Sequence, residues 1–263
     1  MNLLAGRDVT WRFMRVWQRN FIVYRRIWKI NFLPPILEPL FYLLAFGLGF
    51  GSLVGKIVYQ GREIQYVAFI APALLSVNMM YNAFFENTYA SFVRMYYQKT
   101  FDAIMATPLS LREVILGEIA WGATKSLMAT AVMLGVVSAF GLVAYPHGLL
   151  ILPLSFLAGV AFGAVGMVFT GITPTIDMFN LPVFLFITPM FLFSGTFFPL
   201  NDLPTWAQKV AAAFPLTHLV TVTRGLCLGI MSRDYLYGIF YLIVFSLLWI
   251  PLALKAMERR LIR

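Results

Sequence analysis

The chain has 263 residues, of which 60% are hydrophobic and 12% are charged, and its mean hydropathy is +0.81. A soluble domain carries about 25% charged residues, so this chain lacks the polar surface that a water-exposed globule needs. The composition therefore excludes an ordinary soluble protein and predicts an all-α integral membrane protein. The single cysteine, Cys227, excludes a disulfide framework and a cysteine-based metal site, and we expect no metal. The net charge of +9 indicates basic residues at the inner lipid face rather than a nucleic-acid partner.

Residues 8–30 have the pattern of an amphipathic helix. Aromatic residues recur three and four positions apart on one face, and arginines occupy another. The aromatic face contains Phe13, Trp17, Phe21, Tyr24 and Trp28, and the basic face contains Arg12, Arg15, Arg19 and Arg26. Such a helix favours lying flat in the inner headgroup layer. The alternative is that these charges only set the membrane topology.

Six apolar stretches are long enough to cross a bilayer, which takes about 20 residues. They lie at 32–54, 64–91, 112–143, 148–171, 179–198 and 235–257. We therefore predict an interfacial helix over 1–31 and a six-helix transmembrane domain over 32–263. Fourteen basic residues fall on one side of these spans and five on the other. The positive-inside rule then places both termini in the cytoplasm.

A charged interruption at 98–110 separates the second and third spans on the cytoplasmic side. Thr100 can cap a short helix, which Pro108 ends. Ser110 precedes Glu113 by three positions, the spacing of a capping box at the start of the third span.

An apolar patch is predicted on this short helix. Phe101, Ile104 and Met105 share one face because they lie three and four positions apart. We expect the patch either to dock in a groove of a soluble partner or to lie on the membrane.

The second and third spans carry polar side chains at helical spacing. Charged side chains inside a membrane usually face the bundle interior and pair with one another. The predicted intramembrane polar set consists of Glu38, Asn78, Asn82, Glu86, Glu118 and Lys125. We expect Lys125 to pair with Glu86, Glu118 or Glu38. The set serves either as a structural clamp between helices or as a contact for the transported substrate.

Residues 199–233 form the longest stretch without a span. A short helix is expected over 204–214, because Pro204 starts it and Pro215 follows it. Residues 217–230 are apolar but too short to span, which favours an outer re-entrant hairpin over a seventh span.

The sequence argues against two kinds of enzyme, an ATPase and an intramembrane serine protease. The segment 49–56 is the nearest approach to a nucleotide-binding Walker A loop, but its glycine spacing is wrong and Ile57 replaces the Ser or Thr. Ser194-Gly195 and the distant His218 could indicate an intramembrane serine protease, but Leu192 stands where the rhomboid pattern has glycine. We therefore expect a chain that is not an enzyme.

The segment from Thr100 to Ser110 (TFDAIMATPLS) resembles the cytoplasmic coupling segment of ABC-2-type exporter permeases, and its Lys-Thr-Phe-Asp-Ala start resembles the NodJ-like branch of that family. Three further stretches agree: 38–42 with 46–49, 193–200, and 215–218 followed by Arg224. The resemblance covers essentially the whole chain. One departure is Lys99, where the wider family commonly has glycine.

The resemblance implies a half-transporter in the cytoplasmic (inner) membrane of a prokaryote. It would pair with a second copy of itself and with two separate ABC ATPase subunits, which would bind ATP and Mg²⁺ while this chain binds no cofactor. Membrane lipid is a further expected partner. The implied coupling residues are Thr100, Phe101, Asp102, Ile104, Met105, Thr107 and Pro108, and the implied outer re-entrant residues are Ser194, Gly195, Pro199, Pro215, His218 and Arg224.

The implied substrate is an amphiphile of the lipid-linked or lipo-oligosaccharide class that moves outward. The close alternative is efflux of a drug or another hydrophobic compound. An intramembrane enzyme is the remote alternative.

Overall fold

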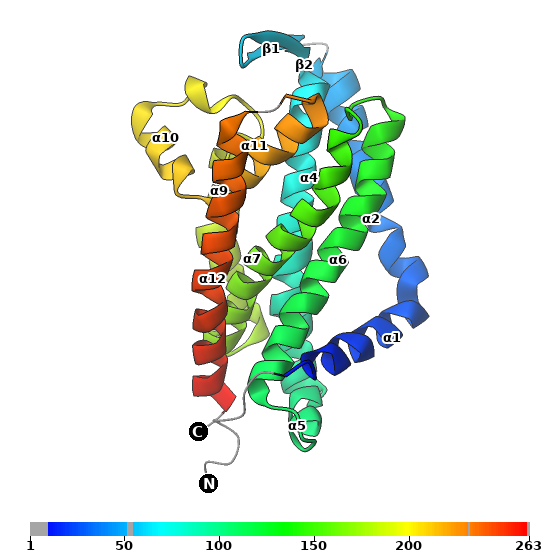
Figure 1. The fold of residues 1–263 in the computed structure, drawn as a ribbon, viewed down its shortest axis with the longest axis vertical. Helices are drawn as coiled ribbons and strands as arrows, with labels where there is room; N and C mark the ends of the chain where they lie inside the picture. The colour runs from blue at the N-terminus through cyan, green and yellow to red at the C-terminus, as the bar shows by residue number, and fades with distance from the viewer. Residues whose placement is uncertain (1–9, 52–54, 231, 262–263) are drawn as a thin grey trace.

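The computed structural model describes residues 10–51, 55–230 and 232–261. Long helices run side by side along the length of the molecule, and short helix α5 lies at one end (Figure 1). Five helical segments are long and apolar enough to cross a membrane: Tyr66–Tyr97, Leu111–Ala139, His147–Ile172, Ile176–Phe193 and Tyr235–Leu261. A sixth arises if α10 (Thr205–Ala212) and α11 (Pro215–Leu228), which meet at a bend of 88°, count as one span. The fold class is therefore confirmed, as a multi-pass all-α membrane protein with five or six candidate spans.

Five of the six predicted spans coincide with these segments. The first predicted span, 32–54, corresponds to α2 (Pro34–Leu44) and the π-helical turn η1 (Ala45–Phe50), which together fall short of the five in length, and residues 52–54 lie outside the described chain. The predicted second span is longer than expected. Helix α4 (Tyr66–Phe85) continues through the π-helical turns η2 (Glu86–Ala90) and η3 (Val93–Tyr97).

The core of the bundle consists of α4, α6 (Leu111–Ala139) and α7 (Ile151–Ile172). These three helices pack on one another, and α12 (Arg233–Leu261) covers α7 while α11 packs on α4. A Cβ added to Gly159 would lie 2.5 Å from the Cα of Ala123, so this glycine lets the backbones of α7 and α6 approach closely. The close approach fixes the depth of α6 against α7.

The segment Ile176–Phe193, predicted as the fifth span, is irregular. It is built from η5 (Ile176–Phe179), α8 (Asn180–Pro182), η6 (Val183–Ile187) and α9 (Thr188–Phe193), and η7 (Leu200–Asp202) follows it. A separate short turn, η4 (His147–Leu150), precedes α7. Short helix α10 occupies the position predicted for 204–214.

A two-stranded hairpin at the end opposite α5 was not predicted (Figure 1). Strands β1 (Lys56–Tyr59) and β2 (Arg62–Gln65) pair antiparallel in the register Lys56↔Gln65. Gln60 and Gly61 both have positive φ, the backbone that a two-residue hairpin turn requires. The hairpin is too short to change the all-α class.

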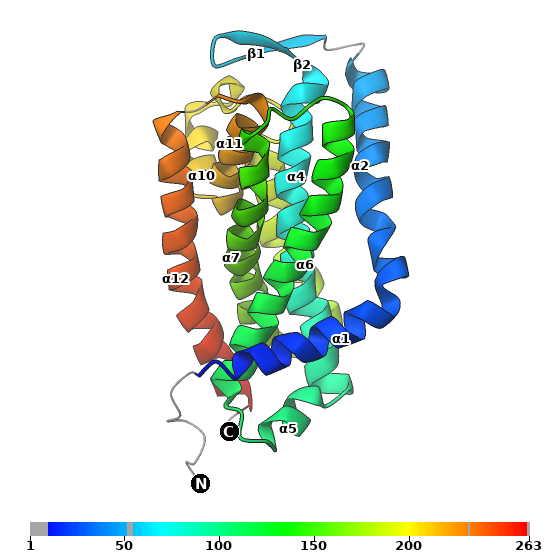
Figure 2. The same ribbon diagram turned by 45° about the vertical axis from the view of Figure 1, so that its right-hand side comes forward.

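Helix α1 (Phe13–Phe32) crosses the bundle obliquely at the α5 end (Figure 2). Part of its aromatic face contacts α6, while Trp28 on that face is 48% exposed, and the flat position of the helix in the headgroup layer stays a prediction. The Trp17 indole Nε1 donates to the Thr124 hydroxyl at 2.9 Å, and the Tyr24 ring packs edge-on to Trp121 at 5.5 Å. Arg12 and Arg15 remain exposed on the outer face. Part of the amphipathic pattern is therefore a packing surface for α6.

Candidate functional site

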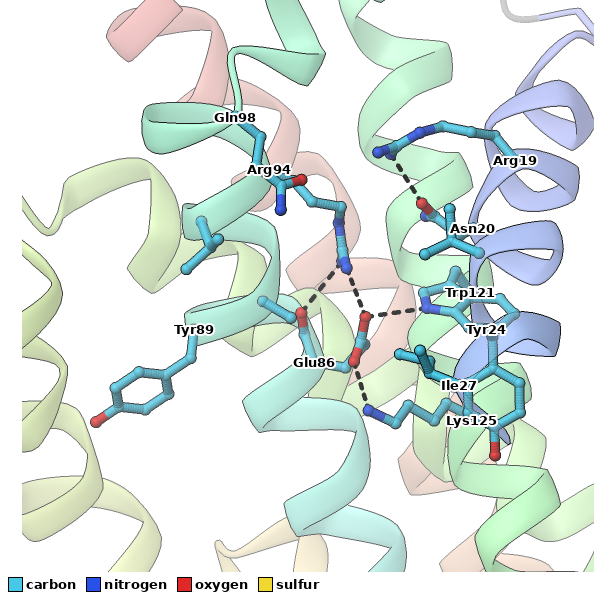
Figure 3. Close-up of a pocket in the computed structure, with 13 residues that line it drawn as sticks. Arg19, Asn20, Tyr24, Ile27, Glu86, Tyr89, Arg94, Gln98, Trp121 and Lys125 are labelled. Atoms are coloured by element: carbon cyan, nitrogen blue, oxygen red, sulfur yellow. Dashed lines mark hydrogen bonds and ion pairs between the residues drawn. The ribbon is translucent and has the colours of Figure 1, made fainter. Parts of the chain in front are cut away.

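Two carboxylates and two cations meet between α6 and the extension of α4, and Figure 3 shows three of them, Glu86, Arg94 and Lys125. The Arg94 guanidinium bridges the two carboxylates, with Nη1 2.8 Å from Glu86 Oε1 and Nη2 2.5 Å from Glu118 Oε2. The Lys125 ammonium lies 2.8 Å from Glu86 Oε2. The four charges balance to zero. A balanced, bidentate arrangement is what makes buried charges tolerable in a membrane interior.

Neutral donors complete the charged cluster, which we define as Glu86, Arg94, Glu118 and Lys125. The Trp121 indole Nε1 donates to Glu86 at 2.9 Å, and the Ser91 hydroxyl donates to Glu118 at 2.7 Å. Asn20 of α1 donates its side-chain amide to Glu118 at 2.9 Å. The cluster therefore joins three elements, α1, α4 with its extension, and α6.

Arg94 was missed as a member of this cluster, because the sequence pattern placed it in a loop between spans. The helix in fact continues to Tyr97, and the π-helical turns η2 and η3 wind with fewer degrees per residue than an α-helix. Eight residues then bring Arg94 back under Glu86. The predicted span ended at residue 91, so Arg94 was counted as a loop residue, and only the acidic Glu86 eight positions earlier pointed to a partner for it.

The other predicted polar residues fall into two groups. Of the two expected partner carboxylates whose side chains the structure describes, Glu86 and Glu118, Lys125 pairs with Glu86. Asn78 and Asn82 bond each other, with the Asn82 amide 3.1 Å from Asn78 Oδ1, and they stand apart from the charged cluster. The Glu38 side chain lies outside the described part of the structure.

A cavity of about 430 Å³ opens beside the charged cluster (Figure 3). Its wall combines cations, aromatic rings and one carboxylate: Arg19, Asn20, Val23, Tyr24, Ile27, Glu86, Tyr89, Ala90, Val93, Arg94, Gln98, Trp121 and Lys125. Burial lowers the pKa of the Arg19 guanidinium, and the charge of Glu118 acts in the opposite direction. The cavity thus offers both positive charge and flat apolar rings between α1 and the bundle.

Helix α5 (Thr100–Met105) occupies the predicted interruption at 98–110. It begins after Lys99, whose φ of +53° is left-handed, so this position favours glycine and explains the family's usual residue there. The Thr100 side chain makes no cap bond, contrary to the prediction. The Ser110–Glu113 capping box is confirmed, with both reciprocal bonds present.

Phe101 of the predicted apolar patch faces inward, which corrects its assignment to a surface free for a partner or for the membrane, while Ile104 and Met105 are half-buried. Phe101 is fully buried and packs with Phe92 and Leu111, and Ile104 and Met105 lie against the same small core. The exposed residues of the segment 98–110 are Gln98, Lys99, Asp102, Ala103, Ala106, Thr107 and Pro108. A partner at this end would therefore meet a small, mostly polar surface.

Helix α1 is tied to the coupling segment as well as to the cavity. Arg19 Nη2 lies 3.4 Å from the Thr100 hydroxyl, and Arg12 Nη1 donates to the Pro108 carbonyl at 3.1 Å. Thr10, just before α1, donates to the Glu113 carboxylate through its backbone N–H at 3.1 Å. A displacement of α5 would thus reach the cavity wall through Arg19.

The predicted outer residues lie at the opposite end of the bundle. Arg224 is buried and donates to the carbonyls of Phe69 and Gly195 at 3.0 and 2.9 Å. Pro215 follows short helix α10, as predicted, and is the first residue of α11. Pro199 instead lines a separate cavity of about 810 Å³ with Phe46, Tyr66 and Phe197.

Ser194 and His218 form no catalytic pair. The buried Ser194 hydroxyl has no hydrogen-bond partner among the described residues. His218 Nε2 lies 2.9 Å from the Ala212 carbonyl, and its ring packs on Tyr241. A serine nucleophile needs a base within hydrogen-bond reach, so this geometry argues against the intramembrane enzyme.

Fold and site together define a class, a multi-pass membrane protein with a short helix at one end tied to a charged intramembrane cluster. The comparison with protein families sharpens this class, because the family described as ABC-2 type transporter matches residues 12–228. The chain belongs to the ABC-2 type transporter family.

Individual relatives agree along nearly the whole chain. Nodulation protein J of Rhizobium leguminosarum bv. trifolii is 35% identical over 99% of this chain and 97% of its own length. Nodulation protein J of Sinorhizobium fredii is 32% identical, with coverage of 96% and 95%. The inner membrane transport permease YadH of Escherichia coli K12 is 24% identical, with coverage of 89% and 93%. The chain is accordingly a transport permease subunit and not an enzyme.

Proposed function

We propose that this chain is half of an ATP-driven exporter that moves an amphiphile of the lipo-oligosaccharide class outward across the inner membrane. The observation that carries this proposal is the cavity beside the charged cluster. It joins cations, which suit polar headgroups, to the rings of Tyr24 and Trp121, which suit sugar faces and lipid chains. The similarity to nodulation proteins J supports the same substrate class.

The α5 end is assigned to the cytoplasm. Twelve basic residues of the described chain belong to the segments at this end, and by the positive-inside rule both termini would be cytoplasmic. The cavity beside Glu86 consequently opens near the cytoplasmic headgroups, where an amphiphile made inside the cell is available.

ATP would drive the chain through a separate subunit. Two copies of this permease would pair with two ABC ATPase subunits, which supply ATP and Mg²⁺. The exposed surface of α5, including Asp102 and Ala103, would receive the ATPase. Movement of α5 would pass to α1 through the contact of Thr100 with Arg19. It would pass to the charged cluster through Arg94, which lies in η3 just before α5.

An ATPase-capture experiment tests the coupling assignment. Ala103→Arg places a large cation on the exposed face of α5 without touching the buried Phe101. Ala213→Arg, at an exposed position next to α10, is the matched control. We expect Ala103→Arg to reduce co-purified ATPase at least tenfold and Ala213→Arg to leave it unchanged, with the melting temperature of the permease equal in both. Equal capture by the two variants would contradict this docking surface.

Transport in proteoliposomes tests the substrate class. The complex should move a fluorescent lipo-oligosaccharide in the presence of ATP, and Tyr24→Ala should slow this transport because the ring lines the cavity. Transport of a hydrophobic dye without transport of the lipo-oligosaccharide would favour the drug-efflux alternative.

A further inference from the structure

A second hollow, unrelated to the charged cluster, lies between the α5-side ends of α7 and α12. It has a volume of about 890 Å³ and is lined by Val168, Gly171, Ile172, Pro174, Trp249, Leu252, Lys255, Ala256, Arg259 and Arg260. We call it the α7–α12 groove. Its lining contains three cations and no carboxylate.

The cations of the groove differ in how they are held. Arg260 is fixed by the end of α7, since its Nη1 donates to the carbonyls of Thr170, at 2.7 Å, and Thr173. Lys255 and Arg259 lie one helical turn apart on α12 and are exposed. Neither makes a hydrogen bond or an ion pair with another described residue. Their charges are therefore available to a ligand.

The nearest acidic side chain on α12 is already engaged. Glu258 accepts from Arg112 Nε of α6 at 2.7 Å. It lines no part of the groove. The positive charge of Lys255 and Arg259 is thus not neutralised from their own helix.

The groove changes from apolar to basic along α12. Trp249 and Leu252 line its deeper part, and Lys255 and Arg259 follow toward the C-terminal end. Ten residues of helix span about 15 Å. The opposite wall is Val168 and Ile172, and Ile172 is 61% exposed. A long apolar wall with cations at one end matches an acyl chain with an anionic headgroup.

We infer that the α7–α12 groove binds one anionic phospholipid, with its phosphate at Lys255 and Arg259 and an acyl chain along Trp249 and Leu252. A soluble anion would leave the exposed apolar wall in water. A zwitterionic phospholipid would bring its own cation against three others. The charge and the apolar length of the groove together select the anionic lipid.

Native mass spectrometry of the full-length chain in detergent tests this inference. Dioleoyl phosphatidylglycerol and dioleoyl phosphatidylcholine are titrated into wild type, Lys255→Gln/Arg259→Gln and a charge-matched control, Arg62→Gln/Lys209→Gln. The control removes two exposed cations at the opposite end of the bundle, away from the groove. Each basic residue near an anionic headgroup is worth about a fivefold change in affinity.

We expect wild type and control to bind phosphatidylglycerol in preference to phosphatidylcholine, and Lys255→Gln/Arg259→Gln to bind phosphatidylglycerol about 25-fold more weakly. An unchanged melting temperature in lipid-free detergent verifies the fold of each variant. Equal binding of the two lipids by wild type would overturn the inference, as would an equal loss in the control. If the groove variant keeps phosphatidylglycerol but loses the ATPase subunit or self-association, a protein occupies the groove and the lipid assignment is wrong.

Discussion

Removal of Arg94 should destabilise the bundle strongly, because it leaves two buried carboxylates without their shared partner. The Arg94 side chain is 13% exposed, while Glu86 and Glu118 are 5% and 0% exposed. Breaking a buried pair by deleting one partner costs about 3–5 kcal/mol, since the remaining charge stays buried. We expect Arg94→Ala to lower the free energy of unfolding by about that amount. Denaturant titration of the purified chain in detergent micelles measures it.

A matched control is available on α6, the helix that carries Glu118. Arg112 also joins α6 to another span, lying 2.7 Å from Glu258, but the two side chains are 43% and 28% exposed. Exposed ion pairs contribute about 0–1 kcal/mol. Arg112→Ala should therefore cost several-fold less free energy than Arg94→Ala. Equal losses in the two variants would refute the claim that burial decides the cost.

A double variant tests whether the unpaired Glu118 carboxylate causes the loss of stability. In an Arg94→Ala background, Glu118→Gln removes the negative charge while Gln keeps the size of the side chain. If the uncompensated carboxylate causes the loss, the double variant should be more stable than Arg94→Ala alone. Additive destabilisation by the two substitutions would show instead that lost packing, and not charge, is responsible.

Three further outcomes are expected from the same unfolding assay. Phe101→Ala should lower the free energy of unfolding by about 3–5 kcal/mol, because the ring is fully buried. If Phe101 were instead a docking residue, the substitution would abolish ATPase capture and leave the stability unchanged. Lys99→Gly should leave the free energy of unfolding unchanged or raise it by up to about 1 kcal/mol, because φ of residue 99 is +53°. Lys99→Val should lower it, and a Val variant more stable than the Gly variant would contradict the left-handed backbone. Gly159→Val should lower the melting temperature because it disrupts packing against Ala123. Gly135→Val should be tolerated, because a Cβ at this position meets nothing within 4 Å. Similar melting temperatures of the two variants would contradict the close approach of α7 to α6.

Local patterns allowed several features to be predicted from the sequence. The capping box of Ser110 and Glu113 needs only a spacing of three residues, and it is present. The short helix at 205–212 followed from Pro204 and Pro215. Apolar length likewise located five of the candidate spans. Each of these depends on residues within one segment, so no knowledge of its neighbours was required.

The charged cluster could be predicted only in part. The cost of a lone charge in lipid predicted that Lys125 finds a carboxylate, but three carboxylates remained possible. The packing of α6 on α4 selected Glu86. Arg94 joined the cluster because the helix continues through η2 and η3 to Tyr97, beyond the predicted end of the span at residue 91.

By itself, the sequence determined which residues form helices, which faces of those helices are apolar, and that buried charges must pair. The tertiary structure decided what each face meets. Phe101 and Trp17 were both predicted on apolar faces, and both contact the bundle, since Phe101 is buried beside α6 and Trp17 donates to Thr124 of α6. The physical reason is that burial of an apolar face is favourable against any apolar neighbour. Periodicity therefore shows that a face will be covered, and only the arrangement of the helices determines by what.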